Sequence, residues 1–185
     1  MRKSHIKKDC DYSERDEKKR AAFDEELANI PSETPVVYVD QCGVTKHLHR
    51  VKGRALRGKR VKMKHPGRRY KRSNVIAGLY GIRILAQRTY AWSTDSIWVA
   101  EWLEWCLIPL LTEAGVIIMD NAPFHNKHAL NTIAQAYGHR ILWLPAYSPD
   151  KNRIENVWAN MKRWLRANAH LYQSIQLAVR EYFQS

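Results

Sequence analysis

Short apolar runs that recur between helical patterns constrain the fold of this chain more than any other feature. They are VVYVD at 36–40, VIIMD at 116–120 and RILWLP at 140–145. Their length and apolar character are typical of buried strands. Two further strand-like runs, 74–81 and 82–90, meet at Gly81 and predict a hairpin.

Helical patterns fill much of the remaining sequence, in the segments 13–30, 93–111, 125–138, from near 149–152 to about 168, and 173–183. We expect Ser13 to cap the first helix, and Ser93 or Thr94 to cap the second. The expected apolar faces contain Phe23, Leu27 and Ile30; Ile97, Ala100, Trp102, Leu103, Cys106 and Leu107; Ala129, Ile133, Ala136 and Tyr137; and Ile154, Val157, Trp158, Met161, Trp164 and Leu165. Three strands followed by helices that alternate with two more strands predict an α/β fold, a mixed sheet flanked by helices.

The length of 185 residues suits one domain with a sizeable core. Pro31 and Pro35 bracket a linker, so we expect an N-terminal helical linker segment, 1–34, and a folded domain, 35–185. The three cysteines form no paired motif, which favours a reducing compartment and argues against a zinc site built on thiolates. No apolar run reaches 18 residues, and the N-terminus lacks the apolar core of a signal peptide. We therefore expect an intracellular protein.

The net charge of +13 and the pI near 9.8 point to a polyanionic partner, nucleic acid before an anionic membrane surface. Between residues 46 and 72 lie 13 Lys or Arg and no Asp or Glu. A solvated basic loop is one explanation, but a run without acidic residues favours contact with phosphates. The candidate DNA-binding residues in it are Lys52, Arg54, Arg57, Lys59, Arg60 and Lys62. A membrane partner is disfavoured because the tract has no apolar face.

Three acidic residues occupy conspicuous positions: Asp40 and Asp120 each end a predicted strand, and Glu155 begins a long helix. Ligands of open α/β sheets bind at the carboxyl ends of strands, so the carboxylates converge if the two strands are neighbours. Converging carboxylates repel one another, and Mg²⁺, which prefers oxygen ligands, removes that repulsion. Two such ions, about 4 Å apart, suit phosphodiester chemistry. Alternatively, an Asp after a strand is often only a turn or cap residue, and a helical Glu is often only exposed.

Three stretches carry a resemblance to a known family: VYVDQCGV (37–44), VIIMDNAPFHN (116–126) and LPAYSPDKNRIENVWANMKR (144–163). They resemble the DDE transposases of the mariner-like group, specifically the bacterial insertion-sequence-630 family. The 34 residues between Asp120 and Glu155 are the spacing typical of that family's second and third acids. The resemblance extends from about residue 13 to the end of the chain.

The resemblance implies a ribonuclease-H-like fold and makes 35–185 the catalytic domain of a DNA-cutting and DNA-joining enzyme. By motif position, Asp40, Asp120 and Glu155 are the three catalytic and metal-binding acids, with Mg²⁺ or Mn²⁺, two ions, as cofactor. The implied partners are transposon ends and a target, usually at a TA dinucleotide, with the protein acting as a homodimer on DNA in the bacterial cytoplasm. The rivals are another nuclease of this fold, such as a ribonuclease H or a junction resolvase, and an inactive DNA-binding remnant.

The chain departs from the family at two motif positions and in its extent. Gln41 and Cys42 replace the Glu and small residue that usually follow the first acid, and Arg153 replaces a Pro whose fixed φ would pre-set the helix start. Relatives also carry a helix-turn-helix region that reads the transposon ends. We expect that part to come from a separate or frameshifted reading frame, or this chain to be a remnant.

Residues near the acids have weaker assignments. Asn121 and His125 are possible supporting residues of the site, with helix capping as the alternative for each. Lys162 and Arg166 follow Glu155 by seven and eleven positions, so they share its helical face and are candidate DNA contacts, with solvation as the alternative. We consider Trp92 for base stacking, and expect five other tryptophans to be mostly core: Trp102, Trp105, Trp143, Trp158 and Trp164.

Overall fold

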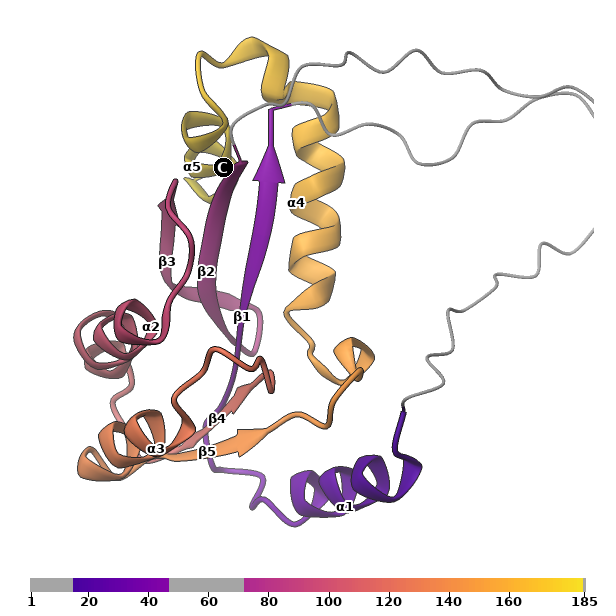
Figure 1. The fold of residues 1–185 in the computed structure, drawn as a ribbon, viewed down its shortest axis with the longest axis vertical. Coiled ribbons are helices and arrows are strands. Elements are labelled where there is room, and N and C mark those ends of the chain that lie inside the picture. Colours follow the sequence, from indigo (N-terminus) through magenta and orange to yellow (C-terminus); the bar gives the residue numbers. More distant parts are fainter. Residues whose placement is uncertain (1–14, 47–71, 185) are drawn as a thin grey trace, which may run out of the picture.

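The structure, a computed structural model, describes residues 15–46 and 72–184, and in this range it contains one five-stranded sheet (Figure 1). The strands are β1 (Val36–Thr45), β2 (Arg72–Tyr80), β3 (Arg83–Tyr90), β4 (Val116–Met119) and β5 (Arg140–Trp143). Their order is β3-β2-β1-β4-β5. β1 is antiparallel to β2 and parallel to β4, and β4 is parallel to β5. The mixed sheet confirms the predicted α/β class, and Gly81, with φ of 59°, turns the predicted hairpin.

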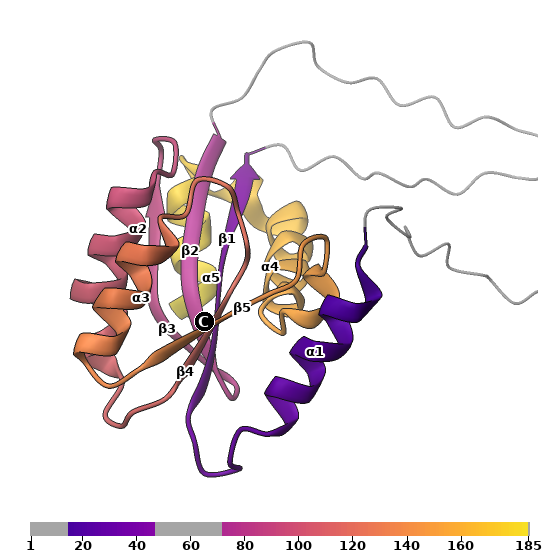
Figure 2. The same cartoon turned by 60° about the horizontal axis from the view of Figure 1, so that its bottom comes forward.

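Helices cover both faces of the sheet: α1 (Glu17–Ala28), α2 (Ser96–Trp102), α3 (Lys127–Ala136), α4 (Glu155–Asn168) and α5 (Ile175–Gln184). Figure 2 shows α2 and α3 on one side and α4 and α1 on the other. Side chains of β1 alternate between the two cores, since successive residues of a strand point to opposite faces. Val37 and Val39 pack with α2 and α3, whereas Tyr38 and Cys42 pack with α4 and α5.

The first expected helix is capped one turn later than predicted, within the part of the chain that the structure describes. Asp16 accepts hydrogen bonds from the backbone N–H groups of Lys18 and Lys19, and the helix begins at Glu17. The proposed cap, Ser13, lies outside the described residues. The predicted stripe is confirmed: Phe23 is buried in the core, and Leu27 and Ile30 pack against it.

The second helix is capped by Asp95, which corrects the expectation of Ser93 or Thr94. Asp95 accepts from the N–H of Trp98, while the hydroxyl of Thr94 is engaged with the hydroxyl of Tyr90 at 2.6 Å. After Trp102 the chain continues as a wider π turn (Leu103–Leu107) and a 3₁₀ turn (Ile108–Leu110). Ile97 is 71% exposed, because positions two apart on a helix face nearly opposite sides and Val99 is the inward residue.

Other predicted core positions are also corrected by the packing. In α3 the inward residues are Leu130 and Ala134, so Ala136, two positions further, is exposed, and Tyr137 lies past the end of the helix. Trp105 is exposed, although Trp102 and Trp158 are deeply buried. The stripe of α4 is confirmed: Ile154, Trp158, Met161 and Leu165 are buried, and Val157 and Trp164 are partly buried.

The position of Asp40 differs from the prediction. β1 does not end there but continues to Thr45, paired with β2 throughout. The parallel pairing of β1 with β4, in contrast, stops at Tyr38 and Ile118. Asp40 and Asp120 each follow that last pair by two residues, so both lie just beyond the point where the strands part. The two strands are neighbours, which meets the condition under which the sequence predicts that their carboxylates converge.

Candidate active site

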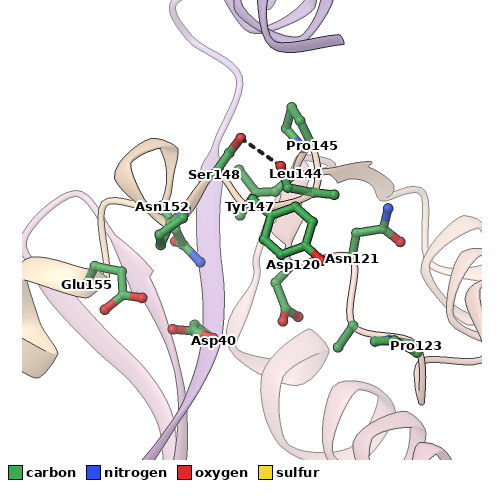
Figure 3. A pocket seen from close by; sticks show the side chains of 13 residues that line it. Asp40, Asp120, Asn121, Pro123, Leu144, Pro145, Tyr147, Ser148, Asn152 and Glu155 are labelled. Atoms are coloured by element: carbon green, nitrogen blue, oxygen red, sulfur yellow. Dashed lines mark hydrogen bonds between the residues drawn. The ribbon is translucent and has the colours of Figure 1, made fainter. Parts of the chain in front are cut away.

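A pocket with a volume of about 400 Å³ lies where β1 parts from β4. Asp40, Asp120 and Glu155 all line it, together with the segments 121–123 and 144–149 and Asn152. Figure 3 shows the three carboxylates extending into the same space from β1, from the loop after β4 and from the start of α4. The three acids that the sequence singled out therefore line one pocket.

Asp40 lies on the α4 face of β1, like Tyr38 and Cys42 on either side of it. Burial raises the pKa of Asp40 to about 7, and the negative charges of Glu155 and Asp120 add to the effect. Hydrogen bonds from the Gln41 backbone and from the Trp158 indole oppose the rise. The indole Nε1–H of Trp158 donates to Oδ2 of Asp40 at 2.9 Å.

Asp120 is the first residue after β4, and its side chain is 44% exposed to the pocket and solvent. Its Oδ1 lies 2.9 Å from Nε2 of His125, whose side chain is fully buried. The chain reverses between the two residues, and the backbone N–H of His125 bonds to the carbonyl oxygen of Ala122. The buried ring of His125 therefore contacts the carboxylate of Asp120. The N-cap of α3 is Asn126, so the capping alternative for His125 is wrong.

Glu155 is the first residue of α4, where a negative charge is favourable because of the exposed N–H groups at a helix start. Burial raises the pKa of Glu155, Asp120 raises it further, and the ammonium of Lys162 opposes both. Arg153 does not prevent the helix start. A 3₁₀ turn (Pro149–Lys151) precedes it, and Arg153 lies over the ring of Tyr38, 5.5 Å from its centroid.

The loop before α4 is anchored to the sheet by Asn152. Its buried side-chain amide donates to the carbonyl oxygen of Val39, at 3.2 Å, next to Asp40 in β1. Ser148 is also buried and accepts a hydrogen bond from Arg20 of α1. Neither residue was predicted to belong to the site: Asn152 had no assigned role, and Trp158 was expected only in the core. Trp158 follows Glu155 by three positions within α4, and this helical spacing is the signal that could have identified it. Asn152 precedes the helix, where such spacing gives no signal.

Of the other predicted site residues, some lie at or near the pocket and some lie outside the described residues. Burial raises the pKa of both Glu155 and the Cys42 thiol, and the charge of Lys162, partly buried on α4, opposes the rise in each. Arg166 is exposed one turn further, and Asn121 lines the pocket. The basic tract with Lys52, Arg54, Arg57, Lys59, Arg60 and Lys62 lies outside the described residues. Trp92 is exposed and packs near the rings of Tyr90 and Trp98.

The chemistry of the pocket suits a hard divalent cation. Its charged ligand atoms are carboxylate oxygens, and the raised pKa values of Asp40 and Glu155 show an electrostatic cost that a cation would relieve. Across residues 15–46 and 72–184, no three His, Cys, Asp or Glu side chains are grouped closely enough to hold a metal ion together. The donor types fit Mg²⁺ or Mn²⁺. In the same range, no helix is both long and apolar enough to cross a bilayer.

Comparison with known protein families shows the family of this chain. The sequence of residues 35–178, which is most of the chain, matches the family described as DDE superfamily endonuclease. The chain belongs to this family. The matched range contains all three acids of the pocket and every strand of the sheet. A comparison of the sequence with curated proteins found no match.

Solved structures similar to this DDE endonuclease include complexes of the Mos1 transposase. The Mos1 transposase paired-end complex with left transposon end matches with a TM-score of 0.70 at 16% identity, over 100% of this chain and 59% of the Mos1 chain. The Mos1 mariner paired-end complex with Mg matches with a TM-score of 0.64 at 13% identity, over 99% and 64%. The catalytic domain of Mos1 mariner transposase matches with a TM-score of 0.60 at 13% identity, over 91% and 78%.

These similarities confirm the predicted ribonuclease-H-like fold, a mixed sheet flanked by helices. The DDE endonuclease spans about three fifths of the Mos1 chain in the paired-end complex. The match to the Mos1 catalytic domain covers a larger share of that chain, 78%.

Proposed function

We propose that this DDE endonuclease is the catalytic domain of a transposase that cuts DNA at insertion-sequence ends and joins it to a target. The observation that carries the proposal is that Asp40, Asp120 and Glu155 line one pocket. The family membership supports it, and the matching structures include a transposase bound to a transposon end.

Asp40, Asp120 and Glu155 are the proposed catalytic residues and would hold Mg²⁺ or Mn²⁺, as two ions. Bound ions of this kind make water a better nucleophile and stabilise the leaving oxygen of a phosphodiester. Each acid comes from a different element, so the pocket depends on the register of β1 with β4 and on the position of α4. The supporting comparison is the Mos1 complex with Mg.

DNA is the proposed substrate and partner, as transposon end and as target. Lys162 and Arg166 continue the face of α4 that begins with Glu155, and the positive charge of Lys162 already reaches Glu155. The basic tract between 46 and 72 supplies further proposed phosphate contacts. We also propose a homodimer on DNA, a helix-turn-helix partner for reading the ends, and a place in the bacterial cytoplasm.

The test is cleavage of a labelled duplex by the purified chain with and without Mg²⁺. We expect Mg²⁺-dependent nicking that falls by at least about a hundredfold in Asp120→Asn, because the substitution removes a charged metal ligand. Glu26→Gln is the matched control: it also removes a carboxylate charge, but Glu26 pairs with Arg140, and neither residue lines the pocket. Its nicking should remain close to wild type.

Two outcomes would contradict the proposal in different ways. Metal-independent DNA binding without any nicking would favour an inactive remnant. Nicking without joining, when a pre-cut transposon end and a target duplex are both supplied, would favour another nuclease of the same fold.

A further inference from the structure

Each aspartate of the site accepts a hydrogen bond on one oxygen from the ring of a buried residue. We propose that Trp158 and His125 are positioning residues: each holds one carboxylate oxygen, so that the other faces the pocket in the orientation that a metal ion requires. The inference rests on the proposed function, because it concerns how the proposed metal ligands are oriented. Neither ring lines the pocket itself.

Trp158 connects the first acid to the helix that carries the third. It follows Glu155 by three positions in α4 and is 1% exposed, with its ring edge-on to that of Phe183. This packing leaves the indole little freedom, and its N–H points at Oδ2 of Asp40, at 2.9 Å. One helix therefore supplies Glu155 and restrains Asp40, which couples two ligands that lie 115 positions apart in the sequence.

His125 restrains the second acid in a comparable way. Its ring lies between those of Phe124 and Trp143, with centroids 4.4 and 6.1 Å away. An ionised carboxylate only accepts hydrogen bonds, so Nε2 carries the proton and donates to Oδ1 of Asp120. Nδ1 is buried and has no partner among the described residues, so a proton there would be a buried donor without an acceptor. The arrangement therefore places a proton on Nε2, where it has an acceptor.

The indole of Trp158 is an uncharged donor, and this distinguishes it from a salt-bridge partner. A Lys or Arg at the same place would neutralise the carboxylate and compete with a cation for its charge. A neutral ring N–H fixes the direction of the carboxylate and leaves its charge available to the pocket. Such outer hydrogen bonds typically change metal affinity or activity by about 10- to 100-fold when they are removed.

The first test measures Mn²⁺ affinity by the loss of the free-ion electron paramagnetic resonance signal, in the full chain without DNA. Trp158→Phe and His125→Leu keep apolar volume but remove the N–H, and we expect each to weaken Mn²⁺ binding about tenfold. His125→Gln restores an amide donor and should recover most of the affinity. Trp164→Phe, a partly buried tryptophan of the same helix, is the matched control and should bind as wild type does.

The second test uses the unaltered protein, so it does not depend on a variant folding. The chain has seven tryptophans, and their indole N–H resonances can be followed by NMR during a Mg²⁺ titration. We expect the Trp158 resonance to move with Mg²⁺ saturation, because its acceptor becomes a metal ligand, and the Trp164 resonance to stay.

The outcomes separate this inference from the proposed function. If the wild type binds no Mn²⁺, the metal-dependent function and the positioning role are both wrong. If it binds Mn²⁺ but the Trp158 resonance does not move, or folded Trp158→Phe and His125→Leu bind Mn²⁺ as tightly as wild type, only the positioning role is wrong.

Discussion

Asp40 occupies an environment that opposes its own ionisation. Burial is the main reason that its pKa is raised to about 7, and the charges of Glu155 and Asp120 act in the same direction. The folded chain therefore binds a proton at Asp40 between about pH 4 and pH 7, where the unfolded chain does not. Stability from this group is greatest at low pH and falls as the pH rises towards 7.

Asp40→Asn should remove this pH dependence. Between pH 4 and pH 8 the unfolding free energy of the variant should gain on wild type by about 2–4 kcal/mol, because the amide carries no charge to bury. The measurement is urea unfolding of both chains in EDTA across this range. The same variant should lose Mg²⁺-dependent nicking.

Asp150→Asn provides a comparison of opposite sign. The Arg20 guanidinium lowers the pKa of Asp150, so its contribution is present at neutral pH and is lost as the pH falls through its folded pKa. This variant should be less stable than wild type at pH 8. If Asp40→Asn were also destabilised at pH 8, the electrostatic cost assigned to Asp40 would be wrong.

At the scale of elements, the site depends on the junction between β1 and β4. The N–H of Val116 bonds to the carbonyl oxygen of Pro35 at 2.8 Å, which begins the parallel pairing. Gly115 allows this approach, since a Cβ there would lie 2.6 Å from the same carbonyl oxygen. Asp40 and Asp120 are brought to equivalent positions beyond the pairing by the register set here.

Gly115→Ala should therefore disturb both stability and activity. The added methyl group forces the start of β4 away from β1, which we expect to cost about 2 kcal/mol of unfolding free energy and to reduce nicking. Gly81→Asn is the control, because nothing lies within 4 Å of a Cβ there and Asn tolerates the positive φ of this turn. Equal effects of the two substitutions on unfolding and nicking would contradict the role assigned to the junction.

At the scale of the whole molecule, α1 packs as part of the described body. Phe23 is 4% exposed in the core shared with α4 and α5. Ion pairs join Arg20 to Asp150, Glu26 to Arg140 and Asp24 to Lys151. Two of these three contacts are with the loop that leads to Glu155. We therefore infer that α1 supports the loop, while the division into 1–34 and 35–185 stays a prediction.

Phe23→Ala tests this inference. The cavity left by the substitution should lower the unfolding free energy by about 3 kcal/mol, as is typical of a buried aromatic residue. It should also speed amide hydrogen exchange in α1 and in the loop that contains Asp150. Leu177→Ala, at a half-exposed position of α5, is the control and should change stability by about 0.5 kcal/mol. Faster exchange confined to α1 would contradict support of the loop.

Local patterns of this protein could be predicted from the sequence, whereas features that depend on contacts and helix boundaries could not. The stripe of α4, the hairpin at Gly81 and the apolar β4 could all be predicted, because residues close in sequence determine periodicity and turns. The exposure of Ile97 and Tyr137 and the cap at Asp95 were missed, because they depend on where each helix begins and ends. Such boundaries are decided by competition among neighbouring caps, as between Thr94 and Asp95.

The sequence by itself determined the strand and helix order and the basic charge, and its motifs singled out the three acids that line the pocket. Only the tertiary structure decided that β1 continues past Asp40, that β1 and β4 part just before both aspartates, and that the rings of Trp158 and His125 contact their carboxylates. The reason is physical: a carboxylate's burial, pKa and hydrogen-bond donors come from elements up to 118 positions away in the chain, and only packing brings those elements together.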